Sequence, residues 1–178
     1  MRHGFALFLI LAAGAVTGAQ GTAPALTVRN GDTTVVLTAQ VLADLPRHTL
    51  EARDERESVT YGGVRLIDVL MRAGVTFGQT MRGPRLASYV VAASPDGFRV
   101  VLALAEIDPD FANREAMVVD HRNGTPLSAR DGPLQLVVPA DIHHARWVRN
   151  LNSLTISIRR AVSIRRAVGR GFTPRRAT

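Results

Sequence analysis

Five side chains that can bind a small polar molecule lie within seven consecutive residues of this chain. They are His143, His144, Arg146, Trp147 and Arg149. A guanidinium offers a rigid fork of donors to phosphate or carboxylate, and its flat face stacks on rings. The indole is the only one in the chain, and it offers a broad surface to a planar ligand together with one N–H donor. The segment therefore predicts a site for a small anionic or heteroaromatic molecule.

The same residues also have a purely structural interpretation. Trp147 and Val148 can pack in the core or at its rim, and Arg146 and Arg149 can form a solvated face, since exposed Arg is common. At this stage both interpretations remain open.

Two predicted strands position the cluster. A Gly-Pro turn leads into the apolar run at residues 134–138, which predicts a buried strand that ends at Pro139. The polar loop that carries the cluster follows, and residues 154–158 predict a second strand.

Short strands and helices are predicted along the rest of the chain. Strands at 25–28 and 33–38 form a hairpin, and strands at 85–93 and 98–104 form another around the turn at 94–97. Helices are predicted at 39–45, after a Thr cap, and at 65–73, before a Gly cap. Residues 48–60 predict an exposed strand or a loop, and residues 105–114 a loop. A strand at 116–120 precedes a type I′ turn at 121–124.

Length and composition suit one globular domain. The chain has 178 residues, of which 46% are hydrophobic. It contains no cysteine, which excludes disulfides, iron–sulfur clusters, thiolate zinc sites and cysteine nucleophiles within the chain.

The net charge of +7 is concentrated near the C-terminus. All 22 basic residues are Arg, and seven of them follow Ser157. Between residues 22 and 156, 14 Arg face 15 Asp and Glu, so this part is not a basic nucleic-acid surface. We expect residues 159–178 to be a basic, disordered tail.

The N-terminus has the form of a secretory signal peptide. A positive start, an apolar run at residues 5–16 and small residues at its exit predict a signal peptide at residues 1–21, with cleavage after Ala19, Gly21 or Ala23. We therefore expect export to the periplasm and a single folded domain at residues 22–158.

No spacing in the chain establishes a catalytic or metal site. His143 and His144 are adjacent, so their side chains point to different sides and lack the i, i+4 spacing of a helical zinc pair. No G-x-S-x-G, P-loop or G-x-G-x-x-G motif occurs.

The order of motifs resembles a known family. Residues 61–75, YGGVRLIDVLMRAGV, are similar to "Y-x-G-V-x-L-x-D-L-L-x-x-A-G-V" in molybdopterin-binding oxidoreductase domains of the sulfite oxidase type. The segments YV at 89–90, SPDGF at 94–98, NGTPL at 123–127, GPLQLVVP at 132–139 and HARWVRNL at 144–151 follow in the family's order. The resemblance implies an α+β fold, with a mixed β-sheet or barrel-like core and a few short helices.

The missing cysteine narrows what the resemblance implies. The enzymes hold molybdenum through a cysteine thiolate and carry a "C-x-G-N-R-R"-like segment, and neither occurs here. The chain then resembles small exported pterin-binding proteins of the PruR type, in which a periplasmic sensor contacts a membrane-bound cyclic-di-GMP enzyme. We expect a tetrahydropterin or related pterin as ligand, no molybdenum cofactor, no catalysis, and the periplasmic domain of a membrane signalling protein as partner.

The resemblance also suggests site residues. By position, Ala145, Arg146, Val148 and Arg149 match the segment that lines the pterin-phosphate side of the enzyme pocket. Ring stacking is assigned to a set of aromatic side chains: Trp147, Tyr89 or Phe98. The amino-pyrimidine edge is assigned to a carboxylate: Asp96, Asp120 or Asp141. His143 and His144 complete the predicted site.

Two alternatives remain open. The chain can be a molybdopterin-dependent oxidoreductase domain or subunit, or a ligand-free periplasmic interaction module whose pocket is filled by side chains.

Overall fold

The computed structural model of the protein describes residues 25–54, 57–112 and 114–158. The predicted signal peptide at 1–21 and the predicted tail at 159–178 lie outside these residues. No helix in the described part is long and apolar enough to cross a membrane.

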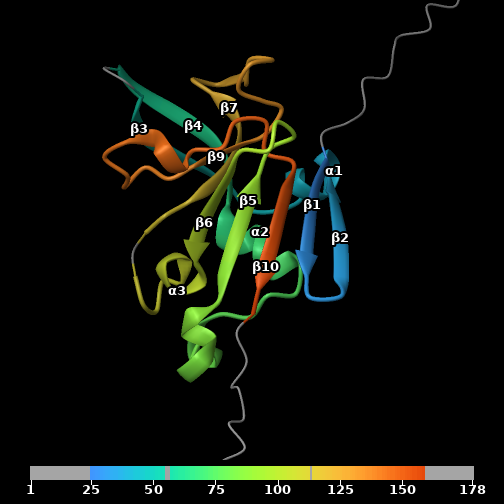
Figure 1. Cartoon of the computed structure of the whole chain (residues 1–178). Coiled ribbons are helices and arrows are strands. Elements are labelled where there is room, and N and C mark those ends of the chain that lie inside the picture. The colour runs from blue at the N-terminus through green and yellow to red at the C-terminus, as the bar shows by residue number, and fades with distance from the viewer. Residues whose placement is uncertain (1–24, 55–56, 113, 159–178) are drawn as a thin grey trace, which may run out of the picture.

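Two five-stranded sheets form the body of the domain (Figure 1). The first sheet has the order β2-β1-β10-β5-β6, in which β1 and β10 run parallel and the other neighbours antiparallel. Its strands are β1 (Ala25–Asn30), β2 (Thr33–Thr38), β5 (Tyr89–Ala93), β6 (Arg99–Ala103) and β10 (Ser153–Ser157).

The second sheet is antiparallel, with the order β3-β4-β7-β8 and with β9 also paired to β7. Its strands are β3 (Arg47–Asp54), β4 (Glu57–Arg65), β7 (Met117–Arg122), β8 (Thr125–Pro126) and β9 (Gln135–Val137). A shift in register between Gly62 and Gly63 interrupts the pairing of β4 with β7.

Short helical elements connect the strands. They are α1 (Ala39–Ala43), α2 (Leu66–Arg72), α3 (Leu104–Ile107) and the 3-10 turns η1 (Gly78–Thr80), η2 (Gly83–Ala87) and η3 (His144–Arg146). Helix α2 lies behind the first sheet in Figure 1, and its buried side consists of Leu66, Val69 and Leu70.

One hydrophobic core joins the two sheets. Leu26 and Leu154 of the first sheet, Val64 and Leu136 of the second, and Leu70 of α2 belong to a single cluster of buried side chains. Because this burial is the dominant favourable term in folding, the cluster fixes the sheets against each other. The α+β class expected from the sequence is confirmed.

Local signals predicted several elements correctly. The Thr38 hydroxyl caps α1 by accepting a hydrogen bond from the Val41 amide at 3.3 Å. Gly74, with φ +81°, follows α2 at the predicted position. Asn123 and Gly124 both have positive φ, of 49° and 77°, as a type I′ turn requires.

Two predicted segments need correction. The strand expected at 85–93 begins at Tyr89, because Gly83 and a Pro at the start of η2 turn the preceding residues into a 3-10 helix. The loop expected at 105–114 contains part of α3, whose Leu104 and Ile107 share one buried side. For residues 48–60 the sequence left a strand and a loop open, and the strand is correct, because the segment belongs mainly to the paired strands β3 and β4.

The close approach of β4 and β7 gives a testable consequence. A Cβ atom on Gly63 would lie 2.2 Å from the Val118 carbonyl oxygen, whereas one on Gly62 would meet its nearest neighbour, the His121 Cβ, at 3.4 Å. We expect Gly63→Ala to lower the free energy of unfolding by about 1–3 kcal/mol, because the backbone must shift. Gly62→Ala should change it by less than about 0.5 kcal/mol. Urea unfolding measures both, and equal effects would contradict this explanation.

Candidate functional site

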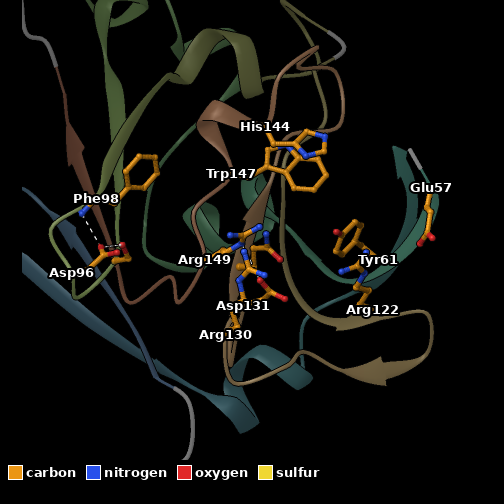
Figure 2. A pocket seen from close by; sticks show the side chains of 12 residues that line it. Glu57, Tyr61, Asp96, Phe98, Arg122, Arg130, Asp131, His144, Trp147 and Arg149 are labelled. Atoms are coloured by element: carbon orange, nitrogen blue, oxygen red, sulfur yellow. Dashed lines mark hydrogen bonds and ion pairs between the residues drawn. The ribbon is translucent and has the colours of Figure 1, made fainter. Parts of the chain in front are cut away.

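A pocket with a volume of about 890 Å³ lies where the β5–β6 turn meets one end of the second sheet (Figure 2). This volume lies within the usual range for small-molecule sites. We call this cavity the arginine pocket. Its lining residues are Glu57, Tyr61, Ser94, Asp96, Phe98, Arg122, Arg130, Asp131, Gln135, His144, Trp147 and Arg149.

One wall of the pocket is a set of packed rings. The Trp147 indole is 7% exposed, and its N–H donates to the Val138 carbonyl oxygen at 2.9 Å. The Tyr61 ring meets the indole at 89°, with the centroids 5.6 Å apart. The His144 imidazole stacks on the indole with centroids 3.7 Å apart and an interplanar angle of 11° (Figure 2). These contacts hold the indole in place.

The ring packing corrects the expectation of a broad free indole surface. His144 covers Trp147, and Val148 is fully buried. Trp147 and Val148 are therefore packed as core residues, as the structural interpretation predicted. Trp147 also forms part of the pocket wall.

Asn150 ties the loop before β9 to the segment after η3. Its backbone has a positive φ of 51°, which Asn tolerates better than most residues. Its side-chain amide donates to the Arg130 carbonyl oxygen at 2.9 Å, and its backbone N–H donates to the Asp131 carbonyl oxygen at 2.9 Å. The Arg149 Nε lies 2.9 Å from the Asp131 carboxylate. Arg130, Asp131 and Arg149 therefore lie together in the pocket (Figure 2).

The charges that line the pocket are balanced. The lining contains three guanidiniums and three carboxylates: those of Arg122, Arg130 and Arg149, and those of Glu57, Asp96 and Asp131. The lining thus offers both donors and acceptors without a net formal charge. Such a surface suits a polar ligand that itself carries donors and acceptors.

The β5–β6 turn supplies an aromatic side chain at the pocket edge. Phe98 is 45% exposed, and the backbone N–H of Phe98 donates to Asp96 at 2.9 Å. The Ser94 hydroxyl donates to the same carboxylate. The hydrogen bond from Ser94 is the main cause that lowers the pKa of Asp96, and the hydrogen bond from Phe98 lowers it further. Both hydrogen bonds fix the turn.

Other predicted site residues are paired outside the lining. The Arg146 guanidinium binds the Asp141 carboxylate at 2.6 and 2.8 Å and Glu106 at 3.0 Å. Hydrogen bonding to Asp141 is the main cause of the raised pKa of Arg146. Asp120 forms two hydrogen bonds with Arg47, at 2.6 and 2.7 Å, and lies 2.7 Å from His121.

The structure therefore brings together five of the predicted residues. Asp96, Phe98, His144, Trp147 and Arg149 line the arginine pocket. The remaining predicted residues do not line it: Tyr89, Asp120, Asp141, His143, Ala145, Arg146 and Val148. Tyr89 lies at the opposite end of β5 from the pocket turn, opposite Ala103 of β6 and Ser157 of β10.

Seven lining residues were not predicted from the sequence. They are Glu57, Tyr61, Ser94, Arg122, Arg130, Asp131 and Gln135. One of them has a visible signal: Gln135 is a polar residue inside the apolar run at 134–138. Tyr61 and Ser94 lie in the quoted segments 61–75 and 94–98, but those segments did not mark them as site residues. The others are brought to the pocket by strand pairing and loop packing.

Side chains that commonly bind metal ions do not gather at one place in the described residues. Within residues 25–54, 57–112 and 114–158, no group of three or more His, Asp or Glu could hold a metal. The chain contains no cysteine. A molybdenum centre bound here would therefore need a protein ligand other than thiolate, or one from another chain.

Comparison with known proteins adds the family. The model of the "Oxidoreductase molybdopterin binding domain" family matches residues 47–164, which is more than half of the chain. The crystal structure of the sulfane dehydrogenase SoxCD from Paracoccus pantotrophus is similar, with a TM-score of 0.57 and 21% sequence identity. The similarity covers 75% of this chain and 38% of the SoxCD chain, and at this identity it concerns the fold. The comparison with curated proteins gave no match.

Two arginines three residues apart should behave differently in stability measurements. Arg146 is 28% exposed and joins two carboxylates, whereas Arg149 is 51% exposed and pairs with Asp131. We expect Arg146→Gln to lower the free energy of unfolding by about 1–2 kcal/mol, because two partly buried carboxylates lose their partner. Arg149→Gln should change it by about 0.5 kcal/mol or less, because solvent screens the half-exposed Arg149 guanidinium and Asp131 keeps its hydrogen bond from the Ser128 hydroxyl. Urea unfolding followed by circular dichroism tests the difference, which similar losses would contradict.

Proposed function

We propose that this chain, which belongs to the oxidoreductase molybdopterin-binding domain family, binds a metal-free pterin in the arginine pocket and catalyses no reaction on it. The observation that carries the proposal is the lining itself: packed rings, charged groups of both signs and a buried amide in one pocket. The family supplies the ligand class, since its members are defined by a molybdopterin-binding domain.

The shape and chemistry of a pterin match this lining. A pterin is a flat two-ring heterocycle with a carbonyl, a ring N–H and an amino group along one edge. Flat rings gain from aromatic contacts, which Phe98 and the His144–Trp147 stack offer. The polar edge requires donors and acceptors together, because a polar group that is buried without a partner is costly.

Charge balance favours a ligand without a phosphate. A phosphate carries one to two negative charges and is bound best by unpaired guanidiniums. In the arginine pocket, Arg149 is paired with Asp131, and two further carboxylates accompany the remaining two guanidiniums. A neutral tetrahydropterin or related pterin suits this balance better than a phosphorylated pterin.

Phe98 provides the sharpest test of pterin binding. It lines the pocket, yet it is 45% exposed, so its removal should cost little stability. We expect Phe98→Ala to weaken pterin binding by about 3- to 10-fold, through the loss of an aromatic contact. Isothermal titration with reduced and oxidised pterins measures the affinity.

Phe111→Ala is the matched control. Phe111 is 49% exposed and does not line the arginine pocket, so its loss should leave affinity unchanged. Equal affinity of the wild type and both variants would remove Phe98 from the site. Absence of binding by the wild-type protein to every pterin tested would contradict the proposed function and favour a ligand-free interaction module.

We further propose that the protein is exported and passes the state of the pocket to a membrane partner. The support is the form of the N-terminal segment and the resemblance to exported pterin-binding proteins of the PruR type. The partner is the periplasmic domain of a membrane signalling protein that controls cyclic-di-GMP. Cross-linking in host cells with and without pterin synthesis tests this relay. The proposal predicts that the protein is cross-linked to a membrane protein and that the amount of this adduct depends on pterin.

A molybdopterin-dependent oxidoreductase domain is the second candidate, and the family match is the observation that favours it. Protein purified from its own host distinguishes the candidates. Our proposal predicts that elemental analysis finds no stoichiometric molybdenum. It also predicts an intact mass that lacks the first 19 to 23 residues, because the small residues there suit cleavage of a signal peptide. Stoichiometric molybdenum would overturn the metal-free proposal, and a mass that retains the N-terminal segment would contradict cleavage.

A further inference from the structure

Gln135 is a buried polar side chain within an apolar strand. It lies in β9, is 4% exposed, and is flanked by Leu134 and Leu136, which are also buried. Its backbone lies opposite Val119 of β7. The side chain lines the arginine pocket.

The amide of this side chain has no protein partner among the residues the structure describes. It takes part in none of the hydrogen bonds of the described residues, and the fully enclosed, unpaired side-chain atoms there belong to His48 and Arg85. The Gln135 amide therefore opens onto the pocket and is not sealed inside the protein. Because a polar group in such a surrounding gains from a hydrogen-bond partner, the donors and the acceptor of this amide are available to a polar molecule that enters the pocket.

The chemistry of the amide specifies what it can bind. A primary amide presents one carbonyl acceptor and two N–H donors in a single plane. It forms two simultaneous hydrogen bonds with a ring edge that carries a donor beside an acceptor, as Gln does with adenine in nucleic-acid recognition. A carboxylate accepts hydrogen bonds but, when ionised, cannot donate.

We propose that Gln135 reads the pyrimidinone edge of the pterin: its carbonyl oxygen accepts from N3–H, and its amide N–H donates to the C4 carbonyl oxygen. This inference rests on the proposed function and specifies the ligand within it. It assigns recognition to an amide in place of the carboxylates expected from the sequence.

The positions of those carboxylates agree with this assignment. Asp120 is engaged by Arg47, and Asp141 is engaged by Arg146. Asp96 lines the pocket edge, but its carboxylate closes the β5–β6 turn through Ser94 and Phe98. Gln135, in contrast, reaches the pocket from a buried strand that has little freedom to move.

The inference is tested with ligands that differ only along this edge. Lumazine retains N3–H and the C4 carbonyl, whereas 2-aminopteridine has neither. We expect the wild-type protein to bind pterin and lumazine with similar affinity and 2-aminopteridine about 10-fold or more weakly, because two hydrogen bonds are lost. Isothermal titration measures all three.

Gln135→Met is the matched variant, because Met has nearly the same length and shape and suits a buried strand. It should weaken pterin binding about 10-fold or more and should bind pterin and 2-aminopteridine about equally. Circular dichroism and thermal unfolding check that it is folded. Gln135→Glu is the second variant: it removes the donor but keeps the polarity, and it should also bind pterin more weakly than the wild type.

The outcomes separate this inference from the proposed function. If the wild type binds pterin and Phe98→Ala weakens that binding, while Gln135→Met binds pterin normally, then the Gln135 assignment alone is wrong. Equal wild-type affinity for pterin and 2-aminopteridine also overturns it. If the wild type binds no pterin, the proposed function fails and the assignment fails with it.

Discussion

The site depends on the pairing of the segment 134–138 with the segment 147–151. Leu136 and Val148 exchange two backbone hydrogen bonds, of 2.9 and 3.1 Å, and the Leu151 amide donates to the Leu134 carbonyl oxygen at 2.8 Å. Leu136 and Val148 are both fully buried. Because neighbouring residues of an extended segment point to opposite sides, Gln135, Trp147 and Arg149 face away from these two residues. All three line the arginine pocket. A slip of one residue would place the apolar pair in the pocket and the polar groups in the core, so burial fixes this register.

The same constraint explains why Arg146 and Arg149 have different roles. Arg149 belongs to the paired segment and is directed to the pocket, where it meets Asp131. Arg146 lies in η3, outside the pairing, and its guanidinium links the loop to α3 through Asp141 and Glu106. The ion pair with Asp141 closes the loop on itself, and the ion pair with Glu106 ties the loop that carries His144 to α3. Arg146 therefore contributes to the site by positioning the loop.

The sequence predicted the elements of the fold better than it predicted the site. Hairpin turns, the Thr38 cap and the Gly74 helix end are local devices, since each depends on a few adjacent residues. The site depends on residues far apart in the chain, such as Tyr61 of β4, Arg122 of β7 and Arg149 after η3. Nor could sequence alone show which charges are already paired: Asp120 is bound by Arg47, 73 residues away. Gln135 was not predicted either, although a polar residue within an apolar run is visible in the sequence.

A charge-balanced pocket has consequences for the kind of selectivity that it can provide. Guanidiniums and carboxylates that already pair with one another gain little from an additional charge, and displacing a partner costs the energy of the existing pair. Hydrogen-bond complementarity along a ligand edge does not require that displacement. It discriminates between ligands because a missing donor or acceptor leaves a buried group unpaired. In the arginine pocket the buried amide of Gln135 is such a group, while the Arg149–Asp131 pair supplies a polar but neutral surrounding. On the proposed function, this lining would distinguish neutral heterocycles by their edges more than it would attract anions by charge.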